Sequence, residues 1–236
     1  KERSRDPEKI INEAKTMVAQ GVREVVLLGQ IIDRYGLDLP TGSPHLPDLL
    51  EQLSTIPDLM RIRFLTSHPN WMNDQLIDAV AQLPKVMPHI EVPIQAGDDA
   101  VLVAMRRGYT NQQYRELVAK LRERIPGVSI ATDVIVGFPG ESEAAFQNTY
   151  DLLADLRLDV AHLARYSPRP GTYSARYLED DIPAEEKMRR FRLLEDLQES
   201  IVAELNQSYL GQSVPVLFEY KVKQRWYGRT PTNRVV

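Results

Sequence analysis

The chain contains no cysteine in its 236 residues, and this absence limits its chemistry. Disulfides, thiolate nucleophiles and zinc or iron–sulfur centres held by cysteine are excluded within these residues. Histidine is also scarce, and its positions do not have the spacing of metal ligands: His45, His68, His89 and His162. We therefore expect no metal ligands in this chain, and we expect the histidines to be ordinary loop or core residues.

Long apolar runs and a strong net charge are missing as well. No segment approaches the roughly 20 apolar residues that a helix needs to span a bilayer, and the charged start does not resemble a signal peptide. The net charge of -4 gives the protein no overall positive potential that would attract a nucleic acid, so any such partner must be bound by a local patch. We expect a cytoplasmic protein with no membrane partner. Because the chain begins at Lys1 rather than at methionine, we expect its natural start to lie upstream.

The sequence does contain a regular alternation of helix-like and strand-like segments. Asp6 and Pro7 predict the start of an amphipathic helix that ends before Gly21. Residues 24–29 form a short apolar run, which is typical of a parallel strand buried on both faces. Further strands are expected at residues 61–65, 90–94, 129–136 and 160–166. Further helices are expected at residues 48–54, 73–82, 111–124, 142–156 and 183–209.

This alternation predicts an α/β fold built on a parallel sheet. The five expected strands are fewer than the eight of a closed barrel, which favours a partial, incomplete (β/α) barrel or a doubly wound sheet. From residue 214 to 220 the pattern becomes alternating, which predicts antiparallel strands of a small β module. We expect the barrel core to occupy residues 1–210 and the start of the β module to occupy residues 211–236.

Candidate binding residues follow the strands, because ligands of parallel α/β domains bind at the carboxyl ends of the strands. The segment 137–141 reads Gly-Phe-Pro-Gly-Glu, and its glycines would allow a close approach of the backbone to an adenine or a ribose. A tight turn before a helix would give the same pattern. Gly29-Gln30 is equally compatible with an ordinary strand exit.

A hydrolase triad is a weaker interpretation. Ser67, His68 and Asp133 supply the residue types, but the chain has no G-x-S-x-G turn to expose a nucleophilic serine. We do not favour a hydrolase.

The end of the chain is basic and aromatic. Beyond Glu219 it carries no acidic residue, and its cations alternate with aromatic side chains: Lys221, Lys223, Arg225, Trp226, Tyr227, Arg229 and Arg234. Cations for phosphates beside rings for base stacking are what single-stranded RNA requires. A solvated strand face would have the same composition, so both interpretations remain.

Nine short motifs, taken in order, carry a resemblance to a known family. They are ERSR at residues 2–5, VLLGQ at 26–30, IRF at 62–64 with TSHP at 66–69, VPIQ at 92–95, MRRGYT at 105–110, TDVIVGFPGE at 132–141, YSPRPGT at 166–172, NQS at 206–208 and GRTPTNRV at 228–235. Their order and spacing resemble the radical S-adenosylmethionine (SAM) methylthiotransferases, and within them the tRNA-2-methylthio-N6-dimethylallyladenosine synthases.

The resemblance implies a partial barrel whose first strand precedes a C-x-x-x-C-x-x-C loop that holds a 4Fe-4S cluster. It also implies an N-terminal domain with a second 4Fe-4S cluster and a C-terminal TRAM domain that binds tRNA. We expect the first strand, the cluster loop and the N-terminal domain to lie outside this sequence, with three cysteines roughly ten to twenty residues before Lys1. The TRAM-like module is expected to be truncated, and the fragment to be inactive alone.

The family chemistry implied for the whole enzyme is transfer of a methylthio group to N6-isopentenyladenosine next to the tRNA anticodon. It proceeds by reductive cleavage of SAM, hydrogen abstraction from an adenine carbon, and sulfur insertion with methyl transfer. The implied partners are the anticodon stem-loop of tRNA and an electron donor such as flavodoxin or ferredoxin, and the implied enzyme is a monomer.

Together, the strand ends, the basic tail and the resemblance predict two sets of site residues, with no catalytic residue in this chain. The cofactor-binding set is Gly29, Gln30, Ser67, Gln95, Asp133, Val136, Gly137, Phe138, Glu141 and Tyr166. The substrate- or RNA-binding set is Arg107, Ser167, Arg169, Lys221, Lys223, Arg225, Trp226 and Arg229. One departure is visible: the family usually has Asn-Val-Asn after Gly-Gln, whereas this chain has Ile31-Ile32-Asp33.

Two alternatives stay open. The same barrel serves methylthiotransferases that modify an aspartate of a ribosomal protein, although residues 107–110 and 228–230 look more like the tRNA branch. A chain that kept the fold and the basic tail without clusters would be an RNA-binding module rather than an enzyme.

Overall fold

The computed structural model describes residues 3–236. Within them the chain forms two compact units, which we describe separately. The first unit contains the residues up to 91, residues 120–129 and residues 214–236, and the second contains residues 92–119 and 130–213. Segments far apart in the sequence therefore share a unit.

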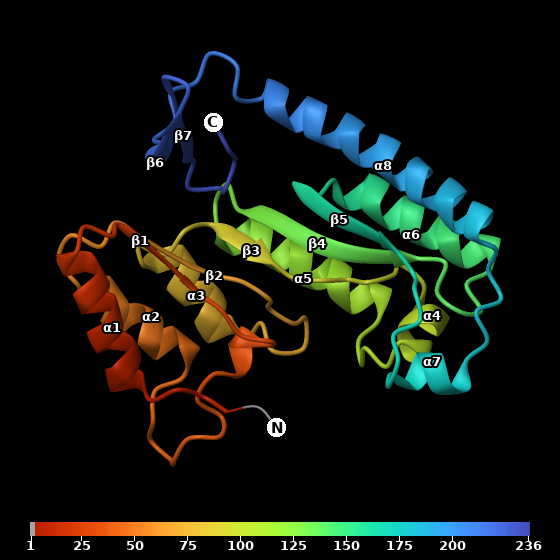
Figure 1. The fold of residues 1–236 in the computed structure, drawn as a ribbon, viewed down its shortest axis with the longest axis horizontal. Coiled ribbons are helices and arrows are strands. Elements are labelled where there is room, and N and C mark those ends of the chain that lie inside the picture. Colours follow the sequence, from red (N-terminus) through yellow and green to blue (C-terminus); the bar gives the residue numbers. More distant parts are fainter. Residues whose placement is uncertain (1–2) are drawn as a thin grey trace. The chain divides into compact units, whose positions relative to one another are not determined.

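The first unit begins with a parallel pair of strands flanked by helices (Figure 1). Its elements up to residue 91 are α1 (Pro7–Ala19), β1 (Glu24–Leu27), the 3-10 turn η1 (Ile32–Arg34), α2 (Leu46–Ser54), β2 (Arg61–Phe64), α3 (Asp74–Gln82) and β3 (His89–Glu91). β1 and β2 run parallel in a register from Glu24 opposite Arg61 to Leu27 opposite Phe64. The expected order of strands and helices is confirmed here.

Capping and apolar spacing explain the helices of this unit. The Asp6 side chain accepts a hydrogen bond from the Lys9 N–H at 3.2 Å, and Pro7 occupies the first turn of α1. Asn73 caps α3 in the same way, accepting from the Leu76 N–H at 2.9 Å. The leucines of α2 are buried at the helical spacing that faces the core.

β1 corrects one expectation, because it is not buried on both faces. Val26 is 44% exposed and Leu28, just beyond the strand, is 73% exposed. Within residues 3–236, β1 pairs with β2 along one edge, whereas every residue of β2 is buried. The apolar run predicted the strand correctly but not its position at an edge.

The second unit is built around β4 and β5 (Figure 1). The remaining elements before the C-terminal hairpin are α4 (Asp99–Ala104), α5 (Asn111–Arg124), β4 (Ser129–Val136), α6 (Glu143–Leu156), β5 (Val160–Arg165), α7 (Tyr173–Tyr177) and α8 (Ala184–Gln207). β4 and β5 are parallel from Ala131 opposite Val160 to Val136 opposite Arg165. α8 packs on β5 and α6.

The strand expected at residues 90–94 is shorter than predicted, since β3 ends at Glu91. The backbone beyond it still follows β4: the Val92 N–H donates to the Ala131 carbonyl and the Gln95 N–H donates to the Asp133 carbonyl. This extended segment places Gln95 beside the second half of β4.

The C-terminal residues form an antiparallel hairpin of β6 (Leu217–Val222) and β7 (Arg225–Arg229), as the alternation predicted. Both residues of its turn have positive φ, 44° at Lys223 and 68° at Gln224, which matches the right-handed twist of the strands. A side chain at Gly228 would collide with the Leu217 carbonyl, so only glycine fits there.

The observed architecture is α/β with parallel strand pairs and a small antiparallel sheet. No closed barrel forms within residues 3–236, which agrees with the expected incomplete barrel. Among the described helices, none combines the length and the apolar character needed to cross a bilayer.

Candidate functional site

In the first unit, the loops that follow β1 and β2 are joined by hydrogen bonds. The Ile32 N–H donates to the Thr66 carbonyl at 3.2 Å, and the His68 N–H donates to the Asp33 carboxylate at 2.9 Å. Thr66 has φ of +71°, a left-handed conformation that is strained for a β-branched residue. The segment after Gly29-Gln30 therefore holds the turn that carries Ser67.

Asp33 and Ser67 are the polar groups of this corner. Asp33 Oδ1 and Ser67 Oγ are buried and form no hydrogen bond of full geometry among the described residues, although the Ser67 hydroxyl lies near enough to the Asp33 carboxylate to oppose the rise of its pKa. Burial raises the pKa of Asp33 to about 6, with the His68 N–H opposing the rise. These two buried oxygens beyond the carboxyl ends of adjacent parallel strands have unused hydrogen-bonding capacity, as a site for a polar ligand requires.

Gly29 and Gln30 line an open cavity of about 1070 Å³ in the same unit. Its walls come from β1, from the η1 segment and from residues near the start of the chain, including Arg3 and Arg5. Gly29 lies against Ile32, because a Cβ atom added at Gly29 would be 3.3 Å from Ile32 Cδ1. The predicted Gly29-Gln30 pair therefore faces open space beside a defined loop.

In the second unit, Gln95 is the residue at which the extended segment stops. It is 6% exposed and has φ of +72°, and its backbone bridges β4 through the Asp133 carbonyl and the Ile135 N–H. A non-glycine residue held at positive φ costs free energy that the surrounding hydrogen bonds must offset. Gln95 is thus fixed rigidly beside the carboxyl half of β4.

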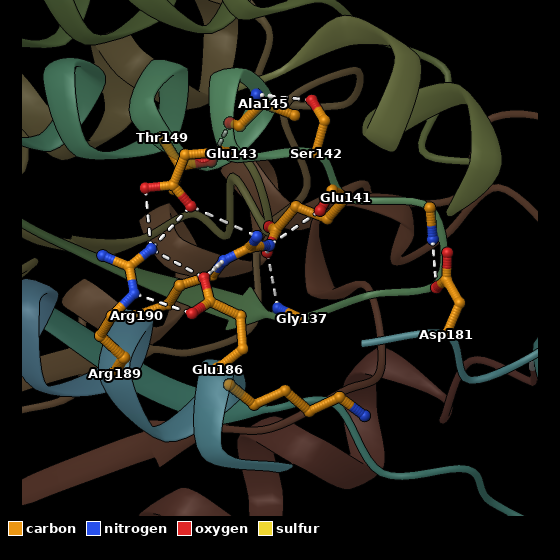
Figure 2. Close-up of polar contacts among 12 residues, drawn as sticks. Gly137, Glu141, Ser142, Glu143, Ala145, Thr149, Asp181, Glu186, Arg189 and Arg190 are labelled. Carbon is orange, nitrogen blue, oxygen red and sulfur yellow. Dashed lines mark hydrogen bonds and ion pairs between the residues drawn. The ribbon is translucent and has the colours of Figure 1, made fainter. Parts of the chain in front are cut away.

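The turn after β4 contains the predicted residues Gly137, Phe138 and Glu141. Gly137 has φ of +71°, and its N–H donates to Glu141 Oε2 at 2.7 Å (Figure 2). A Cβ atom at Gly137 would overlap the side chain of Lys187, so the turn needs glycine for both conformation and space. Glu141 Oε2 closes the turn, and Glu141 Oε1 is buried with no hydrogen-bond partner among residues 3–236.

Glu141 also receives a buried arginine from α8. Arg190 Nη1 donates to the Glu141 carbonyl at 2.8 Å and to Oε2 at 2.7 Å, and Arg190 Nε contacts Glu186 at 2.7 Å (Figure 2). Burial raises the pKa of Glu141, against the opposing effect of the Gly137 N–H and Arg190. The start of α8 is therefore locked to the turn after β4.

Aromatic rings and a lysine complete this corner. Tyr166, directly after β5, packs edge-to-face on Phe138 at 5.1 Å, and its N–H donates to the Val136 carbonyl. The Lys187 ammonium lies 5.1 Å from the centre of the Tyr166 ring and forms an ion pair with Asp180. The structure thus brings Val136, Gly137, Phe138, Glu141 and Tyr166 together at one end of β4 and β5.

The remaining predicted residues of the second unit are more dispersed. Ser167 and Arg169 are exposed beyond β5, and Asp133 is half-buried within β4. Arg107 is half-buried after α4, and its Nε atom has no partner within hydrogen-bond distance in the described chain. Tyr109, near Arg107, has a pKa raised to about 12 by burial.

The predicted RNA-binding residues lie on the hairpin of the first unit. Lys221, Lys223, Arg225 and Trp226 are exposed, and the Lys221 ammonium lies 5.6 Å from the centre of the Trp226 ring. Arg229 is half-buried and pairs with Glu219 at 3.0 Å. The cations are therefore presented beside an exposed ring, as a single-stranded nucleic acid would need.

Sequence reasoning missed several residues that the structure places at these corners. Asp33 was noted as a departure from a family pattern but not as a candidate, and Lys187 and Arg190 are hidden in a long amphipathic helix. The signal for Arg190 was weak, because a single cation on a helix is usually solvated. Among the described residues, no group of three or more histidine, aspartate or glutamate side chains is arranged to hold a metal ion.

Comparisons with known proteins show which family the chain resembles. The family description "Radical SAM superfamily" matches residues 1–153. The tRNA-2-methylthio-N(6)-dimethylallyladenosine synthase of Roseiflexus sp. is 53% identical over all of this chain and half of its own length. The protein of the same name from Chloroflexus aurantiacus is 50% identical over all of this chain and 51% of its own length. The chain thus spans about half the length of these relatives.

Solved structures resemble the fold at low sequence identity. Coproporphyrinogen III oxidase from Escherichia coli, a radical SAM enzyme, has a TM-score of 0.56 at 16% identity, covering 88% of this chain and 48% of its own. A radical SAM methyltransferase from Kitasatospora setae has a TM-score of 0.54 at 18% identity, covering 68% of this chain and 31% of its own. The family expected from the sequence motifs is confirmed, and the chain belongs to the radical SAM superfamily.

Proposed function

We propose that this chain is the central part of a longer methylthiotransferase that modifies tRNA. The observation that carries the proposal is the identity of about half across the entire chain to synthases of tRNA-2-methylthio-N(6)-dimethylallyladenosine. The proposed reaction adds a methylthio group to N6-isopentenyladenosine next to the anticodon.

The strand ends fit SAM in chemical terms. In the second unit, Gly137 has positive φ and no side chain, so a ligand can approach its backbone closely. The rings of Phe138 and Tyr166 form an aromatic wall beside it. We propose that this turn contacts the adenosine part. In the first unit, taken by itself, the buried oxygens of Ser67 and Asp33 form no hydrogen bond of full geometry among the described residues, and we propose that they bind polar groups of a ligand.

The remaining cofactor assignments are part of the same proposal. Gly29 and Gln30 line the cavity beside β1, whereas Asp133 lies in β4 and Gln95 lies beside the carboxyl half of that strand. When bound, SAM and a reduced cluster would supply the radical chemistry. The roles of this chain are to hold the ligand, to orient it and to exclude water with its aromatic wall.

The chain does not fit an iron–sulfur cluster held by cysteine, because it contains no cysteine. We propose that two 4Fe-4S clusters are ligated by residues of the longer protein, with one group of cysteines shortly before Lys1. Within residues 3–236, β1 is paired on one side only, with β2, which supports a further strand that pairs on its other side.

For the substrate side, we propose that Lys221, Lys223, Arg225, Trp226 and Arg229 bind the anticodon stem-loop. The exposed ring beside three cations supports this assignment. Arg107, Ser167 and Arg169 are proposed as further substrate contacts in the second unit. A flavodoxin or ferredoxin as electron donor, a cytoplasmic location and a monomeric state complete the proposal.

The test is an anaerobic assay of the full reading frame, reconstituted with iron and sulfide and supplied with reductant and SAM. One substrate is tRNA that carries N6-isopentenyladenosine, and the other is the ribosomal-protein target of the related aspartate-modifying enzymes. We expect mass spectrometry of nucleosides to detect the methylthio product from the tRNA alone. Modification of the ribosomal protein instead, or RNA binding without any product, would replace this proposal with one of its two alternatives.

A further inference from the structure

Two buried arginines on β2 reach the C-terminal segment of the same unit. Arg61 and Arg63 are 7% and 3% exposed. Arg61 Nη1 donates to the Arg229 carbonyl at 2.5 Å, and Arg63 donates from Nη2 to the Thr230 carbonyl at 2.8 Å and from Nη1 to the Pro231 carbonyl at 2.9 Å. Three successive backbone carbonyls, beginning at the last residue of β7, are therefore held by two side chains of β2.

The charge of this contact is balanced from β1. Arg63 Nε donates to Glu24 Oε1 at 3.1 Å, and Arg61 Nη1 lies 3.9 Å from Glu24 Oε2. Burial lowers the pKa of Arg63, and Glu24 opposes the effect. Since two guanidinium groups face one carboxylate here, the carbonyl dipoles of the C-terminal segment satisfy donors that would otherwise be buried without partners.

A second contact fixes the segment a few residues later. The Asn233 amide lies 3.3 Å from His89 Nε2, and His89 Nδ1 lies 3.2 Å from Ser129 Oγ. Arg61, His89 and Ser129 are the first residues of their strands. The C-terminal segment is thus anchored at the amino end of β2, whereas Ser67 follows the carboxyl end of the same strand.

Arginine is required at residue 63 for a geometric reason. Its side chain uses Nε, Nη1 and Nη2 toward three different acceptors, which its planar fork holds in fixed directions. A lysine ammonium at this depth would reach fewer of them and would be harder to bury. A substitution that keeps only the positive charge, such as Arg63→Lys, should therefore lose part of these hydrogen bonds.

We propose that Arg61 and Arg63 are positioning residues that fix the β6–β7 hairpin on β2, so that an RNA bound by the hairpin is presented in one orientation. The inference rests on the proposed function for its RNA part. Its structural part, the attachment of the hairpin by buried arginines, does not depend on the proposed function. The hydrogen bonds and ion pairs of the two arginines within the described residues go to Glu24 and to the C-terminal segment, so we infer that their effect on the reaction passes through the position of the RNA.

The test uses the full reading frame with Arg63→Lys, and with Arg23→Lys as the matched control, because the Arg23 side chain is 44% exposed. Hydrogen exchange is measured by mass spectrometry across the protein. We expect amide exchange in residues 217–236 to rise at least about tenfold in Arg63→Lys, and exchange in residues 130–156 to stay unchanged. The control should match the wild type throughout.

Asn233→Ala provides a second variant that leaves β2 intact. It removes the contacts of the Asn233 side chain with His89 Nε2 and with Arg229 Nη1, and it places alanine at a φ of +66°. We expect a smaller increase in exchange confined to residues 228–236. If residues 217–236 stay protected in Arg63→Lys and in Asn233→Ala, the proposed attachment is wrong. A uniform rise across the protein in Arg63→Lys, with no local rise in Asn233→Ala, would also overturn it.

A functional measurement separates positioning from general stability. The ratio of methylthiolated tRNA to SAM consumed is measured for Arg63→Lys, together with the affinity for SAM. We expect this ratio to fall at least about threefold while SAM affinity stays unchanged, because a misplaced RNA leaves SAM cleavage uncoupled. An unchanged ratio with a freed hairpin would overturn the RNA part of the inference, whereas a wild-type protein that forms no methylthiolated tRNA would contradict the proposed function instead.

Discussion

Arg190 donates hydrogen bonds to both the backbone carbonyl and the carboxylate of Glu141, at 2.8 and 2.7 Å. The two side chains are 5% and 1% exposed, so the pair is buried. Through it, α8 holds the turn after β4 that contains Gly137 (Figure 2). The proposed adenosine-binding turn therefore depends on a helix nearly fifty residues further along the chain.

Removing Arg190 should leave the buried Glu141 carboxylate without its arginine partner. We predict that Arg190→Met lowers the free energy of unfolding by about 3 to 5 kcal/mol at neutral pH. The double variant Arg190→Met with Glu141→Gln should recover much of this loss, because residue 141 then buries a neutral amide instead of an unpaired carboxylate. Denaturant unfolding measures both, and Arg192→Met on an exposed position is the control. A double variant no more stable than the single one would contradict this explanation.

Gly137 and Gly140 offer a matched pair for the turn. Both have positive φ, but a Cβ atom at Gly137 would overlap Lys187, whereas one at Gly140 would meet open space. We predict that Gly140→Ala costs about 1 to 2 kcal/mol through backbone conformation alone. Gly137→Ala should cost a further 1 to 3 kcal/mol, roughly, through overpacking. Thermal unfolding compares the two, and equal losses would show that Lys187 does not restrict the turn.

The raised pKa of Asp33 predicts a pH dependence of stability. Its folded-state pKa of about 6 exceeds the ordinary value of 3.8, so the folded state binds the proton more tightly. Ionisation therefore costs stability as the pH rises from about 4 to above 6, by up to about 3 kcal/mol. Asn at this position should accept the His68 N–H bond without that cost.

We accordingly predict that Asp33→Asn is more stable than the wild type at pH 7 to 8, and that the difference disappears near pH 4. Melting temperatures across this range measure it. Asp58→Asn is the control, because the Asp58 side chain is 75% exposed. A difference that grows as the pH falls would refute the assignment.

The basic hairpin predicts salt-dependent RNA binding. Replacing Lys221, Lys223 and Arg225 together by Ala should weaken tRNA binding by the full-length protein and flatten the dependence of its affinity on salt. The slope of log affinity against log salt concentration should become shallower by roughly 0.7 to 0.9 for each phosphate that these cations no longer neutralise. Binding titrations at several salt concentrations measure both quantities. Unchanged affinity and slope would remove these cations from the RNA interface.

Local patterns predicted most elements of the fold because their causes are local. The cap at Asp6, the proline beside it and the spacing of the leucines in α2 act within one or two turns of helix. The short helix α4 was missed, although Asp98 caps it, because six residues show too little periodicity. The exposure of β1 was missed because an apolar run does not reveal which strands will flank it.

The site was predictable only where it coincides with strand ends. Gly137 and Tyr166 follow their strands directly, so topology alone placed them at one edge. Arg63 meets Thr230 across a separation of 167 positions, and no spacing in the sequence indicates such a contact. Its burial within β2 is visible only in the structure.

The central claim is that the loops after the strands bind SAM, and hydrogen exchange of the full-length, cluster-loaded protein with and without SAM tests it most directly. We predict that SAM protects residues 28–33 and 66–68 in the first unit, and Gln95, residues 137–141 and Tyr166 in the second. Residues 217–229 should be unaffected until RNA is added. Saturating SAM that leaves these loops unprotected, or that protects the hairpin instead, would contradict the account.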